Sequence, residues 1–315
     1  MDGGIGKIEM LKKANILVLV GGGKSPKFPP NKIIIWDDHQ GKIISKFRFN
    51  ENVINVRLRN DRIISILENK LYIFDLNTLE TISILDTFEN PTGIIGISNG
   101  LDYRLLIAVP YKSQGQLYLG NCFSQELKEL YTIQAHDSKI ACISINREGS
   151  LLATASDKGT IIRIFLTMNG EKISEFRRGT KSVSMYCISF DPNDKFIGCT
   201  SDGGTLHIFS IFGIMKLLNE NNSKNNKLDE EPKNTKSFLG KIGGLLKIKN
   251  SYLNSDRFFA KYKIQENNSL LAFGNDNTFV VINKNGKYYK VAYDPIKGGD
   301  CYKIEEKIYF MMYKL

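Results

Sequence analysis

The chain has 315 residues, of which 42% are hydrophobic and 24% are charged, and its formal net charge is +10. These fractions are ordinary for a globular protein with a buried core, whereas the surplus of lysine and arginine favours an anionic partner, either nucleic acid or an acidic membrane surface. No N-terminal run resembles a signal peptide, and no apolar run reaches the roughly 18 residues that a membrane-spanning helix needs. We therefore expect a cytoplasmic protein.

Short strand-like segments recur along the chain at a nearly constant spacing. The segment Lys32–Asp37 (KIIIWD) is echoed by Lys70–Asp75 (KLYIFD), and a weaker segment follows at 116–120. Two similar turns, 156–160 (SDKGT) and 201–205 (SDGGT), each lead into a strand that contains an Ile-Phe pair. A period of about 45 residues is typical of the four-stranded blades of a β-propeller.

The fourth unit shows the pattern of one repeat most clearly. Its β-branched and aromatic residues favour strands, and no strongly amphipathic helix of ordinary length competes with them. Turn residues divide the unit into four short runs at 140–145, 151–155, 161–165 and 172–176. We therefore predict an all-β fold, a WD40-type β-propeller with six blades in a single domain, 1–315, whose last unit runs from about 259 to 294.

One interval between repeats is longer than the others. It separates the third strand of the fifth unit, near Thr205, from the strand that we assign as third in the sixth unit, near Phe279. The excess falls at 214–250, which contains a polar tract, 219–227, that cannot fill a core. Long loops in compact domains are either functional or disordered, so we predict an inserted loop that is disordered or contacts a membrane.

The second half of this insertion has a helical pattern of apolar residues. Their spacing would place them on one face of a helix, and lysines without acidic residues surround them. Such a segment suits shallow insertion into a membrane surface. The alternative is a disordered loop that docks on its own propeller. The predicted membrane-contacting residues are Phe238, Leu239, Ile242, Leu245 and Leu246.

The end of the fourth unit carries the most distinctive residues of the chain, Phe176, Arg177, Arg178 and Gly179. Successive side chains of a strand point to opposite faces, so the two arginines can serve two separate anion sites. A guanidinium group matches phosphate with a planar fork of donors. The repeats on either side add hydroxyl and imidazole groups, although serine and threonine are also common structural residues in the turns of WD repeats.

Several motifs together resemble one known family. They lie at 3–11, 19–23, 29–38, 90–93, 135–136, 153–156, 159–163, 176–179 and 207–209. With these motifs the chain resembles, nearly end to end, the PROPPIN family of WIPI-type, autophagy-related β-propellers. The resemblance implies a seven-bladed propeller that binds phosphatidylinositol 3-phosphate and phosphatidylinositol 3,5-bisphosphate at two sites. It also implies a role in autophagosome formation or endolysosomal membrane traffic.

Matched motif by motif, the resemblance implies the residues of the two sites. Site one would use His136, Ser156, Thr160, Arg163 and Arg177. Site two would use Arg178, Ser201, Thr205, His207 and Arg257. The protein would then bind peripherally to phagophore, endosomal or vacuolar membranes, with a lipid-transfer protein of the autophagy machinery as a partner.

The resemblance departs from the family at the start of the chain. It begins at the family's second blade, so the six repeats match blades two to seven and the strands of the first blade are missing. Three explanations stay open: an incomplete sequence, which we favour, a ring that stays open, or a ring that closes on six blades. An open ring would leave strand edges unpaired, which promotes aggregation.

Other functions compete with lipid binding. A WD-repeat scaffold that binds proteins without lipid is the main alternative. Nucleic-acid binding is a weaker alternative, because the sequence shows no aromatic-rich basic platform on which bases could stack. For an enzyme, the sequence shows no nucleophile–base pattern, no P-loop and no metal-ligand spacing. The five scattered cysteines suggest neither a zinc site nor a disulfide framework. We therefore expect no enzymatic activity, no cofactor, no metal and no nucleic-acid partner.

Overall fold

A computed structural model describes residues 3–59, 61–98, 105–123, 126–214, 258–264 and 268–309. Within these ranges the chain forms 25 β-strands, so the predicted all-β class is confirmed. No helix in the described ranges is long and apolar enough to cross a membrane. Internal contacts divide the chain into two compact units, Met1–Ile95 with Leu101–Ile133, and Gly96–Gly100 with Gln134–Leu315.

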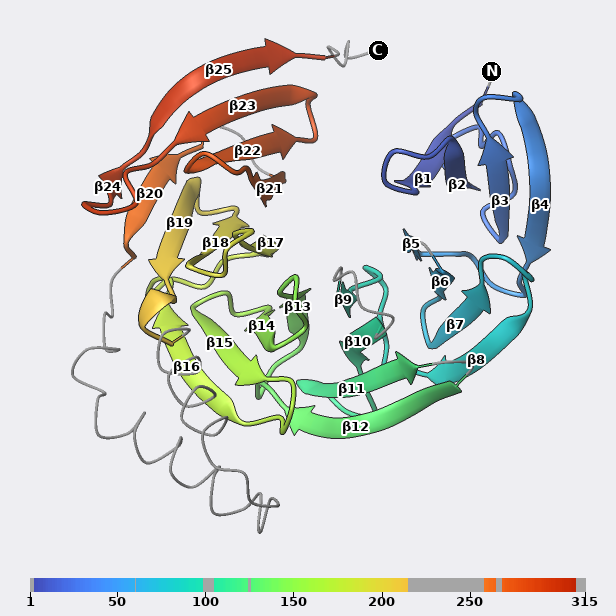
Figure 1. Cartoon of the computed structure of the whole chain (residues 1–315), viewed down its shortest axis with the longest axis horizontal. Helices are drawn as coiled ribbons and strands as arrows, with labels where there is room; N and C mark the ends of the chain where they lie inside the picture. Colours follow the sequence, from blue (N-terminus) through green and yellow to red (C-terminus); the bar gives the residue numbers. More distant parts are fainter. Residues whose placement is uncertain are drawn as a thin grey trace, which may run out of the picture. The chain divides into compact units, whose positions relative to one another are not determined.

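Three sheets come first along the chain, and each is built from consecutive antiparallel strands (Figure 1). The first has the order β1-β2-β3-β4, with β1 (Ile5–Met10), β2 (Ile16–Gly21), β3 (Lys32–Asp37) and β4 (Lys42–Arg48). The second has the order β5-β6-β7-β8, with β5 (Asn55–Leu58), β6 (Arg62–Ile66), β7 (Lys70–Asp75) and β8 (Thr81–Asp86). The third has the order β12-β11-β10-β9, with β9 (Gly96–Ile97), β10 (Leu105–Pro110), β11 (Gln116–Phe123) and β12 (Glu126–Gln134).

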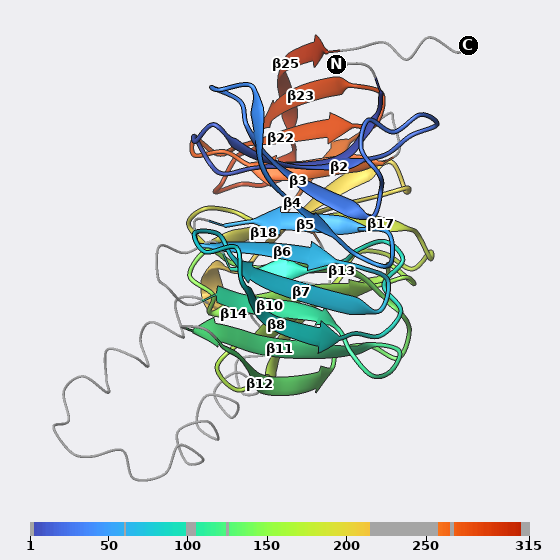
Figure 2. The same cartoon turned by 90° about the vertical axis from the view of Figure 1, so that its right-hand side faces the viewer.

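The first two sheets share one hydrophobic core within the first unit. Alternation along β2 and β3 places Val18, Val20 and Ile35 on one face, where none is more than 2% exposed. They cluster with Val56 and Phe74 of the second sheet, whose four strands lie side by side in Figure 2. Burying each such side chain stabilises the fold by about 1.5–3 kcal/mol. The echo between the segments at β3 and β7 thus reflects equivalent strands of two sheets.

Three more sheets form most of the second unit. The fourth has the order β13-β14-β15-β16, with β13 (Ile140–Ile145), β14 (Leu151–Ser156), β15 (Ile161–Leu166) and β16 (Lys172–Arg177), as the sequence predicted. The fifth has the order β17-β18-β19-β20-β24, with β17 (Met185–Phe190), β18 (Phe196–Ser201), β19 (Thr205–Ser210), β20 (Ala260–Lys263) and β24 (Gly299–Asp300). The sixth has the order β21-β22-β23-β25, with β21 (Ser269–Phe273), β22 (Thr278–Asn283), β23 (Lys287–Ala292) and β25 (Tyr302–Ile308).

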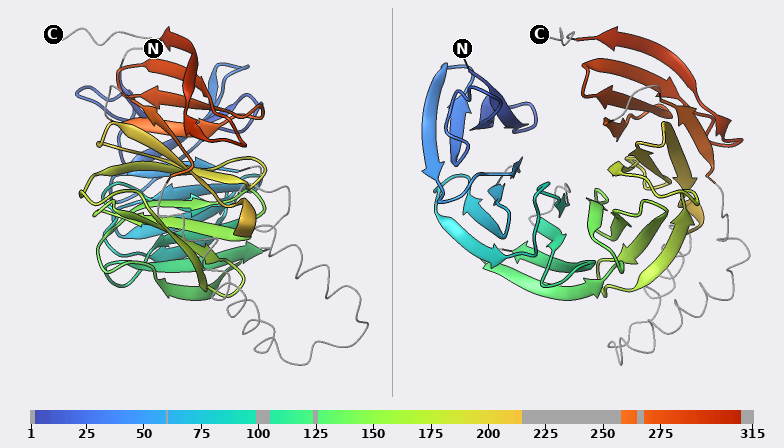
Figure 3. Two further views of the ribbon diagram at one scale, coloured as in Figure 1. Left: turned by 90° about the vertical axis from the view of Figure 1, so that its left-hand side faces the viewer. Right: turned by 180° about the vertical axis from the view of Figure 1, so that it is seen from behind.

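The predicted boundaries of the last repeat are wrong. β20 pairs with β19 and belongs to the fifth sheet, and Figure 3 shows this orange strand beside the yellow one. The sixth sheet runs from β21 to β25, so Phe279 lies on its second strand and not on its third. Short apolar runs look alike in the sequence, and the insertion separates β20 from its neighbour β19. The insertion therefore joins the third and fourth strands of the fifth sheet.

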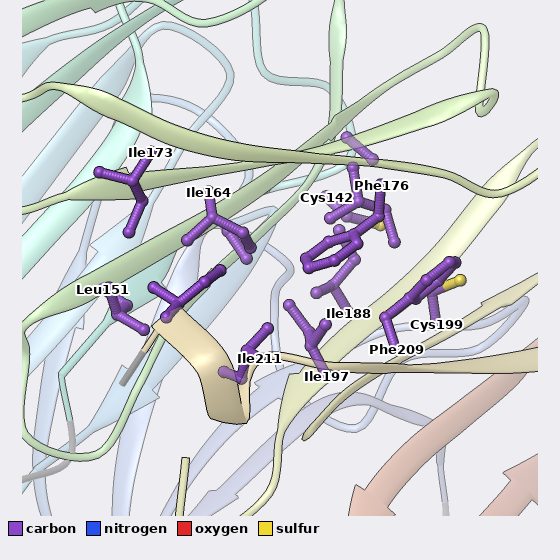
Figure 4. Packing of buried hydrophobic residues seen from close by; sticks show 14 of the residues in the cluster. Cys142, Leu151, Ile164, Ile173, Phe176, Ile188, Ile197, Cys199, Phe209 and Ile211 are labelled. Atoms are coloured by element: carbon purple, nitrogen blue, oxygen red, sulfur yellow. The ribbon is translucent and has the colours of Figure 1, made fainter. Parts of the chain in front are cut away.

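The fourth and fifth sheets face one another across a shared core (Figure 4). Phe176 of β16 stacks on Phe209 of β19 with ring centroids 5.2 Å apart, and both side chains are at most 2% exposed. Ile214, the first residue of the predicted insertion, is buried in the same core. Residues 215–250 of the insertion lie outside the described residues. Side chains alternate along a strand. The inward direction of Phe176 and Phe209 therefore fixes which other side chains of β16 and β19 lie on the faces where the fourth and fifth sheets meet.

Candidate functional site

The arginine turn follows β16, the outer strand of the fourth sheet. Phe176 points into the core shared with the fifth sheet. Because strand side chains alternate, Arg177 lies on the opposite face, where it is exposed. Arg178 returns to the side of Phe176, and its guanidinium group lies beside Gly203 of the fifth sheet. The structure therefore places the two arginines on different faces.

Backbone groups hold the turn in position. The Nε atom of Arg178 donates a hydrogen bond to the carbonyl of Gly159, and Nη2 donates to the carbonyl of Lys181. The amide of Arg178 donates to the carbonyl of Thr160 at 2.9 Å. Gly159 has a φ of +61°, and a Cβ atom there would lie 2.1 Å from the carbonyl oxygen of Val183. Only glycine fits this position, so the turn between β14 and β15 gives Arg178 a defined place.

On the face of Arg177, the predicted residues His136 and Arg163 lie close together. His136 is 5% exposed, and its Nε2 atom is 2.9 Å from Oγ1 of Thr154. Arg163 donates from Nη1 to the carbonyl of Ala135 at 2.7 Å, directly beside His136 in the chain. Thr154 is the cross-strand partner of Arg163. One face of the fourth sheet thus carries a hydroxyl and two guanidinium groups, and the imidazole of His136, which precedes β13 in the chain, lies beside the hydroxyl.

Glu175 belongs to the same group, although the sequence analysis missed it. It is the cross-strand partner of Arg163, and its Oε2 accepts from Nε of Arg163 at 2.9 Å and from Nζ of Lys172 at 3.3 Å. Burial raises the pKa of Glu175, but these hydrogen bonds outweigh it and leave the pKa below its ordinary value. Its position two residues before Arg177 on one strand was the signal for a shared face. We call this group the His136 cluster: His136, Thr154, Arg163, Glu175 and Arg177.

The two predicted hydroxyl residues of site one lie next to this cluster. Ser156 ends β14 and is 7% exposed, and Thr160 is half-buried in the turn that follows. By alternation Ser156 shares the face of Thr154. The carbonyl of Thr160 accepts the hydrogen bond from the amide of Arg178. Neither hydroxyl donates a hydrogen bond within the described part of the chain.

Three predicted residues of site two lie on the fifth sheet, on the face that meets the fourth sheet. Ser201 on β18 and Thr205 and His207 on β19 lie on the face of Phe209, which packs against the fourth sheet. His207 is 8% exposed, and its ring lies 5.1 Å from that of Phe258. The buried Nδ1 atom of His207 has no hydrogen-bond partner among the described residues. A buried polar atom without a partner is costly, so Nδ1 has a hydrogen-bonding capacity that the described residues leave unmet.

Two lysines complete this second group, and the sequence analysis missed both. Lys261 is the cross-strand partner of His207, and Lys263 is that of Thr205. The Nζ atom of Lys261 lies 3.5 Å from Oδ1 of Asp300. Both lysines were overlooked because β20 had been assigned to the sixth repeat. We call this group the His207 cluster: Arg178, Ser201, Thr205, His207, Lys261 and Lys263.

The remaining predicted residues lie outside the described ranges. These are Arg257 of site two and the five membrane-contacting residues Phe238, Leu239, Ile242, Leu245 and Leu246. Their roles stay predictions from the sequence and the family resemblance.

Both histidines are neutral near pH 7. Burial lowers the pKa of His136 to about 4, and the nearby charge of Arg163 acts in the same direction. Burial also lowers the pKa of His207 to about 4, and the charges of Arg178 and Lys261 add to the effect. The imidazoles therefore offer hydrogen bonds, and the positive charge of both clusters comes from arginine and lysine.

The histidine pKa values predict a loss of stability in mild acid. The unfolded chain binds these protons near pH 6.5 but the folded chain only near pH 4, so the free energy of unfolding falls as the pH drops through this window. Asp194 acts in the opposite direction, because burial raises its pKa to about 6. Urea unfolding between about pH 7 and pH 5 should therefore show a flatter profile in His136→Gln/His207→Gln than in the wild type. Parallel profiles would contradict this expectation.

Comparisons with known sequences identify the family. The PROPPIN family model matches residues 6–309. Autophagy-related protein 18e of Arabidopsis thaliana is 29% identical over 313 residues, which cover 99% of this chain and 78% of that protein. SVP1-like protein 2 of Schizosaccharomyces pombe is 35% identical over 213 residues, which cover 67% of this chain and 58% of that protein. The match thus spans less than two thirds of the length of the second relative.

Solved structures show the same fold. Kluyveromyces lactis Hsv2 with its complete loop 6CD matches with a TM-score of 0.73 at 22% identity, over 96% of this chain and 86% of that chain. A complex of KlAtg21 with the coiled coil of AgAtg16 matches with a TM-score of 0.71 at 19% identity, over 96% of this chain and 84% of that chain. The predicted β-propeller class and the family resemblance are both confirmed. The chain therefore belongs to the PROPPIN family, autophagy-related β-propellers that bind other molecules and are not enzymes.

Proposed function

We propose that this protein binds phosphatidylinositol 3-phosphate and phosphatidylinositol 3,5-bisphosphate on membranes and acts as an effector in autophagosome formation or endolysosomal membrane traffic. The observation that carries the proposal is the divergence of Arg177 and Arg178 onto two faces, Arg177 onto the face of Arg163 and Arg178 near the buried His207. Two guanidinium groups that diverge can each neutralise a different phosphate. The protein would then attach peripherally to phagophore, endosomal or vacuolar membranes.

The charge state of the two arginines supports this proposal. A phosphomonoester carries about 1.5 to 2 negative charges at neutral pH and accepts several hydrogen bonds. Arg177 is exposed and forms no ion pair within the described ranges. Among the described residues, the half-buried Arg178 hydrogen-bonds two carbonyl groups and no carboxylate. No carboxylate of the described residues is therefore hydrogen-bonded to either guanidinium group, which supports a role for both in binding an anion.

The insertion supplies a second attachment in this proposal. It leaves the fifth sheet after β19 and returns at β20, and these two strands carry His207 and Lys261 of the His207 cluster. The apolar residues Phe238, Leu239, Ile242, Leu245 and Leu246 would enter the headgroup region while lysines contact anionic lipid. Two weak attachments on one rigid body bind more tightly together than either does alone.

We propose further that the six sheets correspond to blades two to seven of the family's seven-bladed ring. Two solved relatives are described by a loop 6CD, which is complete in one and replaced by a Gly-Ser linker in the other. Here the insertion joins the third and fourth strands of the fifth sheet. If the letters C and D denote the third and fourth strands, the fifth sheet corresponds to blade six.

A second candidate function is the binding of a protein partner, either in addition to lipid or as a scaffold without it. The similar chain KlAtg21 has been solved in complex with the coiled coil of AgAtg16, which favours a coiled-coil protein as one kind of partner. A lipid-transfer protein of the autophagy machinery is the other kind that we propose. A scaffold without lipid binding would keep its membrane localisation after loss of both arginines.

Vesicle flotation tests the lipid proposal. The chain is mixed with vesicles that contain phosphatidylinositol 3-phosphate, phosphatidylinositol 3,5-bisphosphate, unphosphorylated phosphatidylinositol, or phosphatidylserine at matched surface charge. We expect recovery only with the two phosphorylated lipids, because forked donors recognise a phosphomonoester and not negative charge alone. Equal recovery on phosphatidylserine would reduce the interaction to attraction by the net charge of +10. If the chain is recovered with none of the vesicles, the second candidate function, a scaffold that binds proteins without lipid, would be favoured.

A further inference from the structure

The fourth and fifth sheets present the same arrangement of strands at the two clusters. In the fourth sheet, Arg163 of β15 stands between Thr154 of β14 and Glu175 of β16. In the fifth sheet, His207 of β19 stands between Cys199 of β18 and Lys261 of β20. Glu175 and Lys261 therefore occupy equivalent positions on the outer strands of the two sheets.

The next position along the outer strand is also equivalent. Arg177 pairs with Ile161 in the fourth sheet, and Lys263 pairs with Thr205 in the fifth. Side chains two residues apart on a strand share a face, so Glu175 accompanies Arg177 while Lys261 accompanies Lys263. The two clusters thus differ at one outer-strand position by a full reversal of charge.

This reversal changes the charge that each cluster offers to a ligand. Glu175 accepts hydrogen bonds from Arg163 at 2.9 Å and Lys172 at 3.3 Å, so much of their charge is neutralised inside the His136 cluster. Arg177 is the remaining cation that bonds no carboxylate within the described ranges. The His136 cluster therefore offers one uncompensated guanidinium group, next to a carboxylate that repels further negative charge.

The His207 cluster holds more positive charge. Arg178, Lys261 and Lys263 all belong to it, and the nearby acids, Asp202 and Asp300, are both exposed. Asp300 is 82% exposed and lies 3.5 Å from Lys261, and such surface pairs are weak because water screens them. His207 adds no charge, but its buried Nδ1 still lacks a partner among the described residues.

We propose that the His207 cluster selects the bisphosphorylated headgroup, that the His136 cluster is limited to a single phosphate, and that Glu175 and Lys261 are the positions that determine this difference. The inference rests on the proposed phosphoinositide function and deepens it. A second phosphate adds about 1.5 to 2 negative charges to the inositol ring. That charge is attracted by Lys261 and Lys263 but repelled by Glu175.

Single-arginine variants isolate the two clusters for the test. Arg177→Thr leaves the His207 cluster as the functional site, and Arg178→Thr leaves the His136 cluster. Each variant is titrated with vesicles that carry phosphatidylinositol 3-phosphate or phosphatidylinositol 3,5-bisphosphate at equal molar fraction. We expect Arg177→Thr to prefer the bisphosphate by about tenfold, and Arg178→Thr to bind the monophosphate as well as the bisphosphate or better. Both lipids are measured on the same variant, so partial unfolding lowers both affinities and leaves their ratio intact.

Charge changes at the two positions then test the determinants. In the Arg178→Thr background, Glu175→Gln should raise affinity for the bisphosphate by roughly five- to tenfold, because the carboxylate no longer repels the second phosphate. In the Arg177→Thr background, Lys261→Gln should remove the bisphosphate preference. Asp300→Asn is the matched control, since it removes the exposed partner of Lys261 and should leave the preference in place.

The outcomes separate this inference from the proposed function. Failure of the wild type to bind either lipid would overturn the phosphoinositide function itself. Binding of both lipids with the same preference in Arg177→Thr and Arg178→Thr would leave that function standing and overturn the selectivity. The assignment of the two determinants would be contradicted if Glu175→Gln and Lys261→Gln left the ratio of the affinities for the two lipids unchanged. It would also be contradicted if Asp300→Asn removed the preference for the bisphosphate.

Discussion

Replacing both arginines of the turn, in Arg177→Thr/Arg178→Thr, should reduce affinity for phosphoinositide vesicles by more than about a hundredfold. A hydrogen bond to a charged group contributes about 1.5–3 kcal/mol, and each factor of ten in affinity corresponds to about 1.4 kcal/mol. Arg177 and Arg178 lie on different faces and bond no carboxylate within the described ranges, so their losses should add. Flotation and titration with vesicles measure the effect.

The control for this variant removes the same charge from another place. Lys42 and Lys46 are exposed on β4, the outer strand of the first sheet. Lys42→Thr/Lys46→Thr also lowers the net charge by two and should change affinity by less than about threefold, because surface charges act only through screened attraction. If both double variants lose affinity equally, general basicity explains membrane binding and the arginine turn has no special role.

The second large effect is on stability. Phe176→Ala should lower the free energy of unfolding by about 3–5 kcal/mol, because removal of a buried aromatic ring leaves a cavity. The ring is 2% exposed and stacks on Phe209 in the core between the fourth and fifth sheets. Urea unfolding at neutral pH measures the change.

A phenylalanine outside the core provides the matched control. Phe212 is 53% exposed, so Phe212→Ala should change stability by no more than about 0.5 kcal/mol. A similar loss in the two variants would contradict the placement of Phe176 in the core. That result would also contradict the assignment of Arg178 to the face that meets the fifth sheet and of Arg177 to the other face, since this assignment follows from the inward direction of Phe176.

The strands of the fourth sheet were readable from the sequence because their signal is local. Alternating branched and aromatic residues with intervening turns marked 140–145, 151–155, 161–165 and 172–176, and the observed strands agree to within a residue at each end. The strand period of two also placed Arg177 and Arg178 on opposite faces. The candidate residues of both sites followed from the family resemblance, and all but Arg257 lie in described parts of the chain.

By itself, then, the sequence determined the β class, the repeat and the residues of the arginine turn, because strand alternation and turn chemistry depend only on near neighbours. The tertiary structure decided which strand pairs with β19 across the insertion, and with it the positions of Lys261 and Lys263. It also decided that Glu175 binds Arg163 and that both histidines are buried and neutral. These properties depend on cross-strand pairing and burial between segments far apart in the chain, which no local pattern of residues encodes.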